Sequence, residues 1–383
     1  MKIAVLTTAH RPDDDRIYYK EVVSLLTRHP QVDLIAPVQP GEAYALGPGV
    51  ALHPLPRRRG VWGRLRTVAA AAAEAIRLKP DVCHFHDLDF VVMAPWVRWR
   101  CGAKMVYDAH EVYPESMLIS PNIPALLRPL AAWIVDAVEK TCARACSLIV
   151  TADAPNTESF ARTGVRAVTL FNYPRLSLFA PDPARVEALR RDFAGRRVLI
   201  YQGTMSRDRG LFHMLDGVRL LKKDVPEVLL LLVGLNDARL RAEAEERIRR
   251  DGLDGQVRIV PWAPHADMAN HMALAEIGLV PWQPSEKNKK NIPIKVFEYM
   301  ACGLPLLGAD LPSTTPYIAG SGAGVVYDST DEEAFAREAR RMLGDAPGRE
   351  RMARAGREAV AREWNWGEME KRMLAAYAEL EEP

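Results

Sequence analysis

Short apolar runs that alternate with longer helical segments constrain the fold of this chain more than any other feature of its sequence. The runs are rich in valine, isoleucine and leucine; seven lie before residue 173 and six after residue 196. Consecutive parallel strands need a crossover connection, and helices in that role cover both faces of the sheet. The sequence therefore predicts an α/β protein with doubly wound parallel sheets. The predicted strands are KIAVLTTA, VDLIAP, VALHPLP, DVCHFH, KMVYDAH, SLIVTAD and AVTLFN, followed by RVLIYQG, EVLLLLVG, VRIVPW, IGLVPW, LPLLGAD and GAGVVYD.

The alternation is interrupted once, over the proline-containing segment from Asn172 to Asp192. Such a segment is typical of a linker, and 383 residues are enough for two cores. We therefore predict an N-terminal domain over 1–174 and a C-terminal domain over 175–364. Ligands of doubly wound sheets bind beyond the C-terminal ends of the strands, so we expect the two sheets to face each other across a cleft.

The composition excludes several classes of protein. Charged residues make up 26% and the net charge is +2, which is too small a basic surplus to indicate nucleic-acid binding. No apolar stretch reaches the roughly 20 residues that span a bilayer, and Met1 leads directly into a strand without a secretory-signal pattern, so we expect a cytoplasmic protein. The five cysteines are scattered, so we expect reduced thiols, with Cys142 and Cys146 packed rather than bound to zinc.

The segment NIPIKVFEYMACGLPLLGAD, which begins at Asn291, predicts a short helix that leads into a buried strand. Free N–H groups at a helix start bind anions, so Asn291, Ile292 and Ile294 are candidates to hold a diphosphate, with charge added by Lys295. Glu298 lies one turn further on, where its carboxylate can accept hydrogen bonds from two ribose hydroxyls. The spacing fits equally well a solvated glutamate beside a solvated lysine loop.

Two further groups of polar residues follow predicted strands. His84, His86 and Asp87 end one strand, and His110 ends the next one along the chain. A His-x-His zinc site is one interpretation of the first group, and a purely structural histidine is one interpretation of the second.

Several blocks of the sequence resemble family 4 glycosyltransferases, which are retaining enzymes of the GT-B fold. The run KVFEYMACGLPLLGAD is similar to the donor-site helix of that family, and the resemblance extends over almost the whole chain. The other matching blocks are VCHFHDLD, VYDAHEVYPE, IYQGTMSRDRGL and EWNWGEMEKRMLAAY.

The resemblance implies roles for individual residues. Glu298 matches the glutamate that holds the donor ribose, and Arg209 matches the basic residue that faces the donor phosphates. His110 matches the histidine near the donor sugar, so His110, Arg209 and Lys295 form the expected catalytic set. Gly203, after strand RVLIYQ, is a further expected donor contact.

The base pocket is expected at PWAP, where Trp262 either stacks on the base or packs. From the residues alone, Arg209 also fits a surface turn. The resemblance further implies that helix 365–383 packs back onto the first domain, that the second domain binds the nucleotide sugar, and that no metal cofactor is needed. His86, Asp87, His10 and Arg11 are expected on the acceptor side.

Two departures from the family pattern concern the donor sugar and phosphates. Lys290 replaces the first glutamate of the Glu-x7-Glu motif, so this chain is a FEYMA-type member that lacks it. The first loop, TTAHRPDDDRI, lacks a Gly-Gly pair, and we expect His10, Arg11 and Arg16 to take its place, with residues 13–15 turned to solvent.

A basic and aromatic segment precedes the alanine-rich helix. It runs from Arg57 to Arg66 and includes Val61, Trp62 and Leu65. Such a mixture can rest on an anionic membrane surface at the inner membrane face, although it also fits a solvated loop. Membrane contact would be peripheral and would favour a lipid-linked acceptor.

We therefore expect a retaining, metal-independent glycosyltransferase that uses a nucleotide-diphosphate sugar of the UDP or GDP type. Its acceptor would be a hydroxyl of a glycan, a lipid-linked sugar or a small molecule. Lys290 leaves open a catalytically impaired nucleotide-sugar-binding or regulatory protein of the same fold. A nicotinamide oxidoreductase is a weaker alternative, because no Gly-x-Gly-x-x-Gly follows the first strand.

Overall fold

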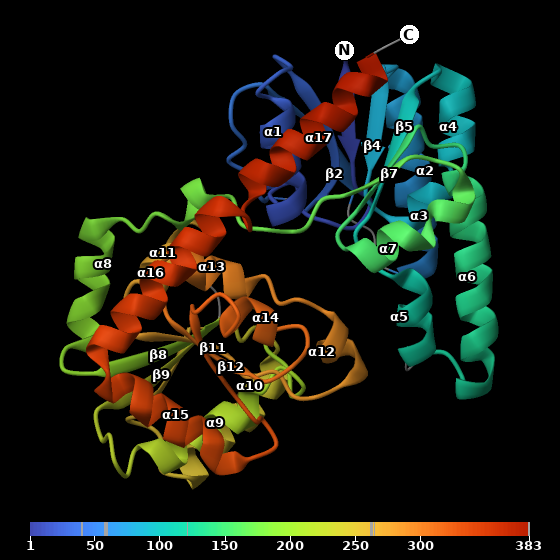
Figure 1. The fold of residues 1–383 in the computed structure, drawn as a ribbon. Coiled ribbons are helices and arrows are strands. Elements are labelled where there is room, and N and C mark those ends of the chain that lie inside the picture. Colours follow the sequence, from blue (N-terminus) through green and yellow to red (C-terminus); the bar gives the residue numbers. More distant parts are fainter. Residues whose placement is uncertain (40, 57–59, 121, 261–262, 264, 382–383) are drawn as a thin grey trace. The chain divides into compact units, whose positions relative to one another are not determined.

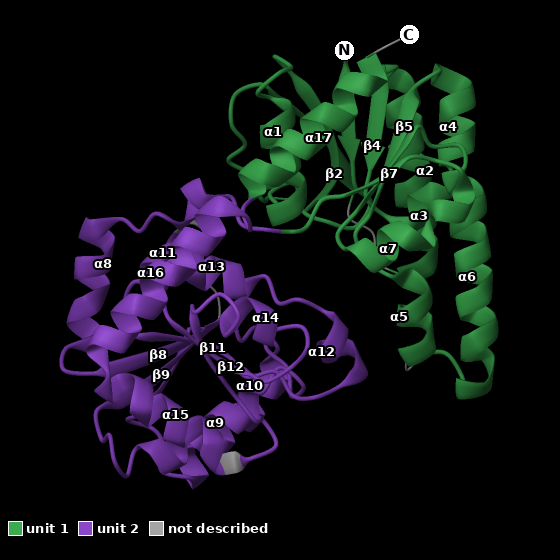
Figure 2. Cartoon of the chain, in the orientation of Figure 1, with its two compact units in different colours: residues 1–172, 366–383 green, residues 173–365 purple. Residues whose placement is uncertain are grey.

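The computed structural model describes residues 1–39, 41–56, 60–120, 122–260, 263 and 265–381. These residues form two compact units (Figure 2). Unit 1 contains residues 1–172 and 366–383, and unit 2 contains residues 173–365. Each unit is built around its own parallel sheet, which confirms the predicted pair of Rossmann-like domains.

The sheet of unit 1 has seven parallel strands in the order β3-β2-β1-β4-β5-β6-β7. Figure 1 labels β2, β4, β5 and β7 among them. The order reverses at β1, whose Ile3 pairs with Val32 on one side and Val82 on the other. Strand ends at such a switch point diverge and leave room for a ligand. The strands are β1 Ile3–Leu6, β2 Val32–Val38, β3 Val50–Pro56, β4 Val82–Phe85, β5 Lys104–Ala109, β6 Leu148–Thr151 and β7 Ala167–Thr169.

Helices of unit 1 bury small apolar faces against this sheet. In α2, Val68, Ala71, Ala72 and Ala75 are buried at helical spacing. The last helix, α17, returns to this unit, where its Trp366 Nε1 donates to Ser24 Oγ at 2.8 Å. The helical elements are η1 Asp15–Val22, α1 Val23–Leu25, α2 Gly60–Leu78, α3 Leu88–Val91, α4 Ala94–Cys101, α5 Tyr113–Ile119, η2 Ala125–Leu127, α6 Arg128–Ala143, α7 Ala154–Ser159, η3 Ala161–Thr163 and α17 Trp366–Glu381.

The sheet of unit 2 has six parallel strands in the order β10-β9-β8-β11-β12-β13, with the same reversal after the central strand. Strand β9 is buried along its whole length, as expected for a strand covered on both faces. The strands are β8 Arg197–Gln202, β9 Val228–Val233, β10 Val257–Val260, β11 Ile277–Val280, β12 Leu306–Ala309 and β13 Gly324–Tyr327.

One helix of unit 2, α13, depends on a glycine for its position. A Cβ on Gly278 of β11 would lie 2.7 Å from the Tyr299 ring, so only glycine lets α13 approach this closely. The helical elements are η4 Leu176–Phe179, α8 Pro183–Arg190, η5 Arg191–Phe193, α9 Leu211–Leu221, α10 Ala238–Arg250, α11 His265–Met272, α12 Glu286–Lys290, α13 Lys295–Ala301, α14 Thr315–Ile318, α15 Glu332–Gly344 and α16 Ala346–Arg362.

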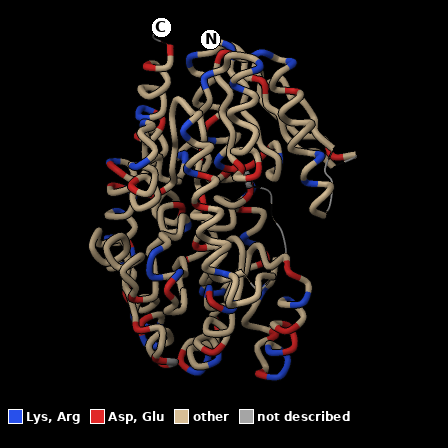
Figure 3. Tube along the Cα trace, turned by 90° about the vertical axis from the view of Figure 1, so that its right-hand side faces the viewer, with Lys and Arg blue, Asp and Glu red and all other residues tan. Residues whose placement is uncertain are grey.

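Charges of both signs are distributed along both units (Figure 3). All five cysteines are free, as predicted. Within the described part of the chain, no helix combines the length and the apolar character that crossing a bilayer requires.

Candidate functional site

Lys295 opens α13 and is almost completely buried. Its Nζ donates a hydrogen bond to Tyr201 Oη at 2.7 Å and lies 3.9 Å from the centre of the Tyr201 ring. Tyr201 is near the C-terminal end of β8, where ligands of such sheets bind. Lys295 is therefore a buried lysine held at a strand end, and not part of a solvated loop.

Arg209 and Lys295 lie beside the same indole. The centre of the Trp282 ring is 5.6 Å from Arg209 Cζ and 5.8 Å from Lys295 Nζ. Trp282 follows β11, is buried, and its Nε1 has no hydrogen-bond partner among the described residues. Trp282 was not predicted from the sequence, because a tryptophan after a buried strand gives no signal beyond packing.

The turn that carries Arg209 owes its position to the glycine that follows. Gly210 has φ +84°, and a Cβ there would lie 2.0 Å from the carbonyl oxygen of Pro281. Only glycine fits so close to the segment that carries Trp282. Arg209 Nη1 also donates to Thr204 O at 2.9 Å, which fixes the side chain within its loop. The close approach of this turn to Pro281 therefore explains why a glycine follows Arg209.

Glu298 lies in the middle of α13 and is half-buried. Its Oε2 accepts a hydrogen bond from the Gln202 side chain, and Gln202 N donates to Tyr299 Oη at 3.0 Å. The Glu298 carboxylate therefore faces the end of β8. Its partner Gln202 directly follows Tyr201, the residue that binds Lys295. Gly203 follows with φ +92°, and its N–H donates to Val233 O at 2.9 Å. Gln202 is a second residue that the sequence analysis missed.

The prediction that Asn291 offers a free backbone N–H is wrong. Residues 286–290 form their own short helix, α12, and the Asn291 N–H donates to Lys287 O at 3.0 Å. Ser285 caps the start of α12 by accepting from Asn288 N, which explains why this polar run is helical. Ile292 and Ile294 remain predicted donor contacts beside Lys295. Trp262 lies outside the described residues.

In unit 1, predicted residues from three strand ends come together. The His110 ring, after β5, is 5.4 Å from the His10 ring and 6.1 Å from the His86 ring. Asp87, after β4, accepts from Thr7 Oγ1 at 2.8 Å and from Thr8 N at 2.6 Å. His10, His86, Asp87 and His110 therefore form one cluster at the ends of β1, β4 and β5.

His10 is held between two carboxylates of this cluster. Its Nδ1 is 3.4 Å from Asp14 Oδ2, and its Nε2 is 3.7 Å from Asp87 Oδ1. The hydrogen bond to Asp14 raises the pKa of His10, with a further contribution from the charge of Asp87. The first loop thus places a readily protonated imidazole at the switch point of the sheet.

Arg11 Nε donates to Asp13 Oδ1 at 2.9 Å on the surface, and the place of Arg11 on the acceptor side stays a prediction. The structure corrects one expectation for the first loop. Asp14 and Asp15 are not turned to solvent. Asp14 accepts from two backbone N–H groups at the start of η1, and Asp15 Oδ2 lies 2.5 Å from Lys20 Nζ.

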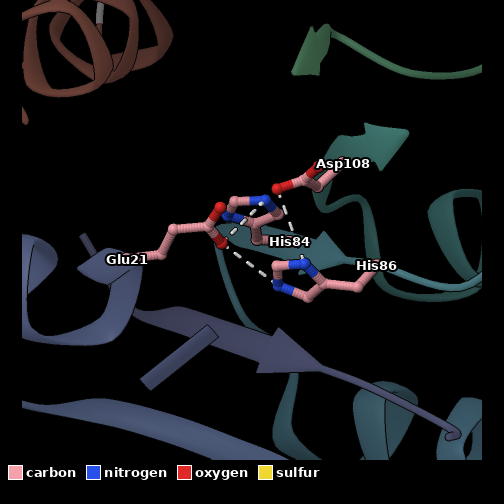
Figure 4. Close-up of side chains that lie close together, drawn as sticks. All are labelled: Glu21, His84, His86 and Asp108. Carbon is pink, nitrogen blue, oxygen red and sulfur yellow. Dashed lines mark ion pairs between the residues drawn. The ribbon is translucent and has the colours of Figure 1, made fainter. Parts of the chain in front are cut away.

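Behind this cluster lies a group of four completely buried side chains, Glu21, His84, His86 and Asp108 (Figure 4). Glu21 Oε2 is 3.2 Å from His86 Nε2 and 3.7 Å from His84 Nε2. Asp108 Oδ2 is 3.6 Å from His86 Nδ1, on the other side of that ring. Tyr377 Oη of α17 forms a hydrogen bond with His84 Nδ1 at 2.7 Å.

A buried arginine supplies positive charge to the four-residue group. Arg16 Nε is 2.8 Å from Asp108 Oδ2 and 3.2 Å from Glu21 Oε1. Burial raises the pKa of Glu21 well above its usual range, and the charge of Asp108 raises it further. Burial also acts to raise the pKa of Asp108, but the charge of Arg16 opposes it, and the pKa lies well below its usual range. Burial and the charge of Asp108 thus favour the protonated form of Glu21, and the charge of Arg16 favours the ionised form of Asp108.

The two histidines of the group are neutral. Burial lowers the pKa of His84 to about 4 and that of His86 well below its usual range. By residue type and mutual distance the four side chains fit a divalent transition metal, since their ligand atoms all lie within 4.8 Å of one another. The Arg16 guanidinium already neutralises the carboxylate charge that such a metal would bind, which favours the metal-free network.

A cavity of about 420 Å³ opens in unit 1 next to the strand-end cluster. Arg64, from the predicted basic segment, lines it and pairs with Asp89 Oδ2 at 2.5 Å. Asp89 in turn accepts from Thr8 Oγ1 at 2.6 Å. Arg64 therefore belongs to this cavity, and residues 57–59 lie outside the described residues. The lining consists of Thr8, Ala9, Pro37, Gly60, Val61, Arg64 and Thr67.

Two units with the same Rossmann-like strand order, each gathering polar side chains at its strand ends, define the GT-B class of protein. Residues 190–359 match the family described as glycosyl transferases group 1, and residues 18–174 match the glycosyl transferase 4-like domain. The chain belongs to these group 1, family 4-like glycosyltransferases.

Named relatives are similar over different shares of the chain. A D-inositol 3-phosphate glycosyltransferase of Jonesia denitrificans is 27% identical over 47% of this chain and 42% of its own length, so this chain spans less than half of that relative. A phosphatidyl-myo-inositol mannosyltransferase of Mycobacterium leprae is 24% identical over 91% of this chain and 88% of its own length.

Solved structures share the fold at low sequence identity. The Anabaena protein HepE in complex with UDP-glucose has a TM-score of 0.72 at 15% identity and covers 99% of this chain and 100% of its own. Sucrose-phosphate synthase from Thermosynechococcus elongatus has a TM-score of 0.74 at 19% identity and covers 99% of both chains.

Proposed function

We propose that this protein transfers a sugar, with retention of configuration, from a nucleotide-diphosphate sugar bound to unit 2. The observation that carries the proposal is the gathering of Arg209 and Lys295 around Trp282. Two cations beside one strand end suit a leaving diphosphate, whose charge grows as the sugar departs. FEYMA-type residues at this place in a GT-B chain support the same conclusion.

Each side chain has a distinct part in this proposal. Arg209 meets the phosphates with two parallel N–H groups, and it stays charged at every relevant pH. Lys295 has three N–H donors, and its bond to Tyr201 Oη leaves others for a phosphate oxygen. Glu298 holds the ribose hydroxyls, with Gln202 fixing the orientation of its carboxylate.

The donor is proposed to carry UDP or GDP. The HepE structure holds UDP-glucose, and a relative from Mycolicibacterium smegmatis is named as a GDP-mannose-dependent mannosyltransferase. The latter is 25% identical over 49% of this chain and 50% of its own length. Lys290 stands where many family members carry a sugar-binding glutamate, so it is the residue proposed to alter the choice of sugar.

Unit 1 is proposed to bind the acceptor hydroxyl. The cavity lined by Thr8 and Arg64 borders the cluster of His10, Asp87 and His110, so an acceptor there lies beside groups that can exchange protons. His110 is proposed to donate a hydrogen bond to the transferring group. No metal is assigned to the reaction, because the Arg16 guanidinium already occupies the charged centre of the buried group.

Thermal-shift measurements with UDP, GDP, ADP and dTDP, followed by their sugars, test the donor proposal. We expect UDP or GDP to raise the melting temperature more than the other two nucleotides. Free nucleotide released from the preferred nucleotide sugar would then show a live transferase. Binding without nucleotide release or sugar transfer would instead identify a nucleotide-sugar-binding protein. The replacement of the family glutamate by Lys290 would then account for the lost activity.

A further inference from the structure

Exposed apolar side chains are distributed unequally over this chain. Among the described residues, every large apolar side chain that is exposed belongs to unit 1. Apart from Met1, all of them lie between Val61 and Val138. Protein surfaces rarely gather large apolar residues without a partner, so this asymmetry calls for one.

Helix α6 faces its apolar residues outward. Leu130, Trp133, Ile134 and Val138 recur at helical spacing and are all exposed, with Trp133 at 67%. The opposite face of the helix is buried and carries Glu139, which accepts from Tyr107 Oη at 2.7 Å. A helix that simply faced water would show the reverse pattern. We call these four exposed residues the apolar stripe.

The stripe continues onto the end of a helical hairpin. Helices α5 and α6 lie side by side and end together at the connection that joins them (Figure 1). Leu118, Ile119, Leu126 and Leu127 are exposed there, and Leu126 is 94% exposed. Between Glu115 and Asp136 the sequence contains a single charged residue, Arg128.

Arginine and tryptophan border the stripe on the neighbouring helix. Helix α4 contacts α6 and exposes Trp96 and Trp99, the latter at 76%. Arg98 and Arg100 are its only charged residues, and the Arg100 guanidinium lies 5.9 Å from the Trp99 ring. Tryptophan and arginine together are typical of groups that settle between lipid headgroups and acyl chains.

We infer that the apolar stripe, the hairpin end and α4 form a docking surface for an anionic lipid bilayer. The apolar side chains would enter the acyl region, and the α4 arginines would meet anionic headgroups. A second copy of this chain is a poorer occupant, because α4 carries no acidic residue to pair with the same arginines from its twin. The basic residues at the start of α2 are not part of this surface, and its assignment does not depend on the donor site.

Flotation of the full-length protein with vesicles tests the inference. Phosphatidylcholine vesicles that contain phosphatidylglycerol should carry the protein upward, and pure phosphatidylcholine vesicles should carry less. The variant Leu126→Ser/Leu130→Ser/Trp133→Ser should lower partitioning by about tenfold or more, since three large apolar groups are lost. All three side chains are exposed, so the core is untouched.

Two further variants locate the surface. Trp99→Ser/Arg100→Ser should weaken vesicle binding, mainly by reducing its dependence on anionic lipid. Trp62→Ser is the matched control on α2, and it should bind like the unsubstituted protein.

Absence of vesicle binding, or loss of binding only in Trp62→Ser, would overturn the assignment. A dimer in light scattering that the triple variant abolishes, without vesicle binding, would assign the surface to a second copy instead. Nucleotide binding by the same variants would stay intact in every case, which separates this inference from the proposed function.

Discussion

Lys295 Nζ lies 2.7 Å from Tyr201 Oη, so a buried hydrogen bond ties the first residue of α13 to the end of β8. The same strand end reaches α13 again through Gln202, whose side chain donates to Glu298. These two contacts fix the lysine proposed to face the diphosphate and the glutamate proposed to face the ribose on one short, rigid frame.

Loss of the tyrosine hydroxyl should therefore weaken catalysis through Lys295. We expect Tyr201→Phe to lower kcat/KM by about tenfold, and Lys295→Ala to lower it by about 100-fold or more, because the second change removes the charge itself. Initial rates of nucleotide release check both. Lys289→Ala, on the exposed side of α12, is the control and should leave the rate unchanged. Equal rates for Lys295→Ala and the unsubstituted protein would remove the lysine from the mechanism.

Arg209 should matter far more than its neighbour Arg207. Arg207 pairs with Glu243 on the surface, whereas Arg209 lies over Trp282. We expect Arg209→Ala to lower kcat/KM by about 100-fold or more with little change in melting temperature, since the side chain is proposed to act on the leaving group. Arg207→Ala should behave like the unsubstituted protein. Similar losses from both variants would indicate a general effect of loop charge.

Substitutions of the two carboxyl residues in the buried group of unit 1 should have very different effects on stability. Burial favours the protonated form of Glu21, so Glu21→Gln should change the free energy of unfolding by about 1 kcal/mol or less. Asp108 is ionised against Arg16, so Asp108→Asn should cost about 3–5 kcal/mol by leaving a buried guanidinium without its partner. Urea denaturation of both variants measures this. Equal destabilisation, accompanied by loss of a bound metal, would show that the group is a metal site.

Acid should destabilise unit 1 before its carboxylates are titrated. In the unfolded chain both buried histidines titrate near pH 6.5, whereas burial lowers the pKa of folded His84 to about 4. Between those values the unfolded chain binds more protons, so stability falls as the pH drops through this window.

The His84 contribution is about 3 kcal/mol. The raised pKa values of Glu21 and His10 partly offset this slope, because at these two sites the folded chain keeps a proton that the unfolded chain has released. Urea midpoints at pH 7, 6 and 5 should therefore decrease in that order, and His84→Gln should flatten the trend. A urea midpoint that rises from pH 7 to pH 5 would contradict the conclusion that His84 and His86 are neutral in the folded protein.

Periodicity was sufficient to predict both sheets from the sequence. Runs such as RVLIYQG and EVLLLLVG became adjacent parallel strands, because a strand buried on both faces must be apolar throughout. Motif resemblance singled out Glu298, Arg209 and Lys295. It could not indicate Trp282 or Gln202, whose roles arise only when separate strand ends meet.

Hydrogen bonds and ion pairs of polar residues were the part of the structure that the sequence did not predict. Asn291 looked like a free helix start, but the capped turn of residues 286–290 uses its N–H. The acidic run after Arg11 looked solvated, but Asp14 caps η1 and Asp15 holds Lys20. Nothing in the sequence indicated that Arg16 and Glu21 are buried beside His84 and His86, because such burial depends on contacts between distant segments of the chain.

Calorimetric titration of UDP and GDP into the unsubstituted protein and into Glu298→Ala tests the donor site most directly. One nucleotide should bind the unsubstituted protein, and Glu298→Ala should weaken that binding by about tenfold or more, since two ribose hydrogen bonds to a charged acceptor are lost. The 2′-deoxy form of the same nucleotide should show a smaller difference between the two proteins, since only its 3′-hydroxyl can still donate to Glu298. Unchanged affinity in Glu298→Ala, or no binding of either nucleotide, would contradict a donor site on α13.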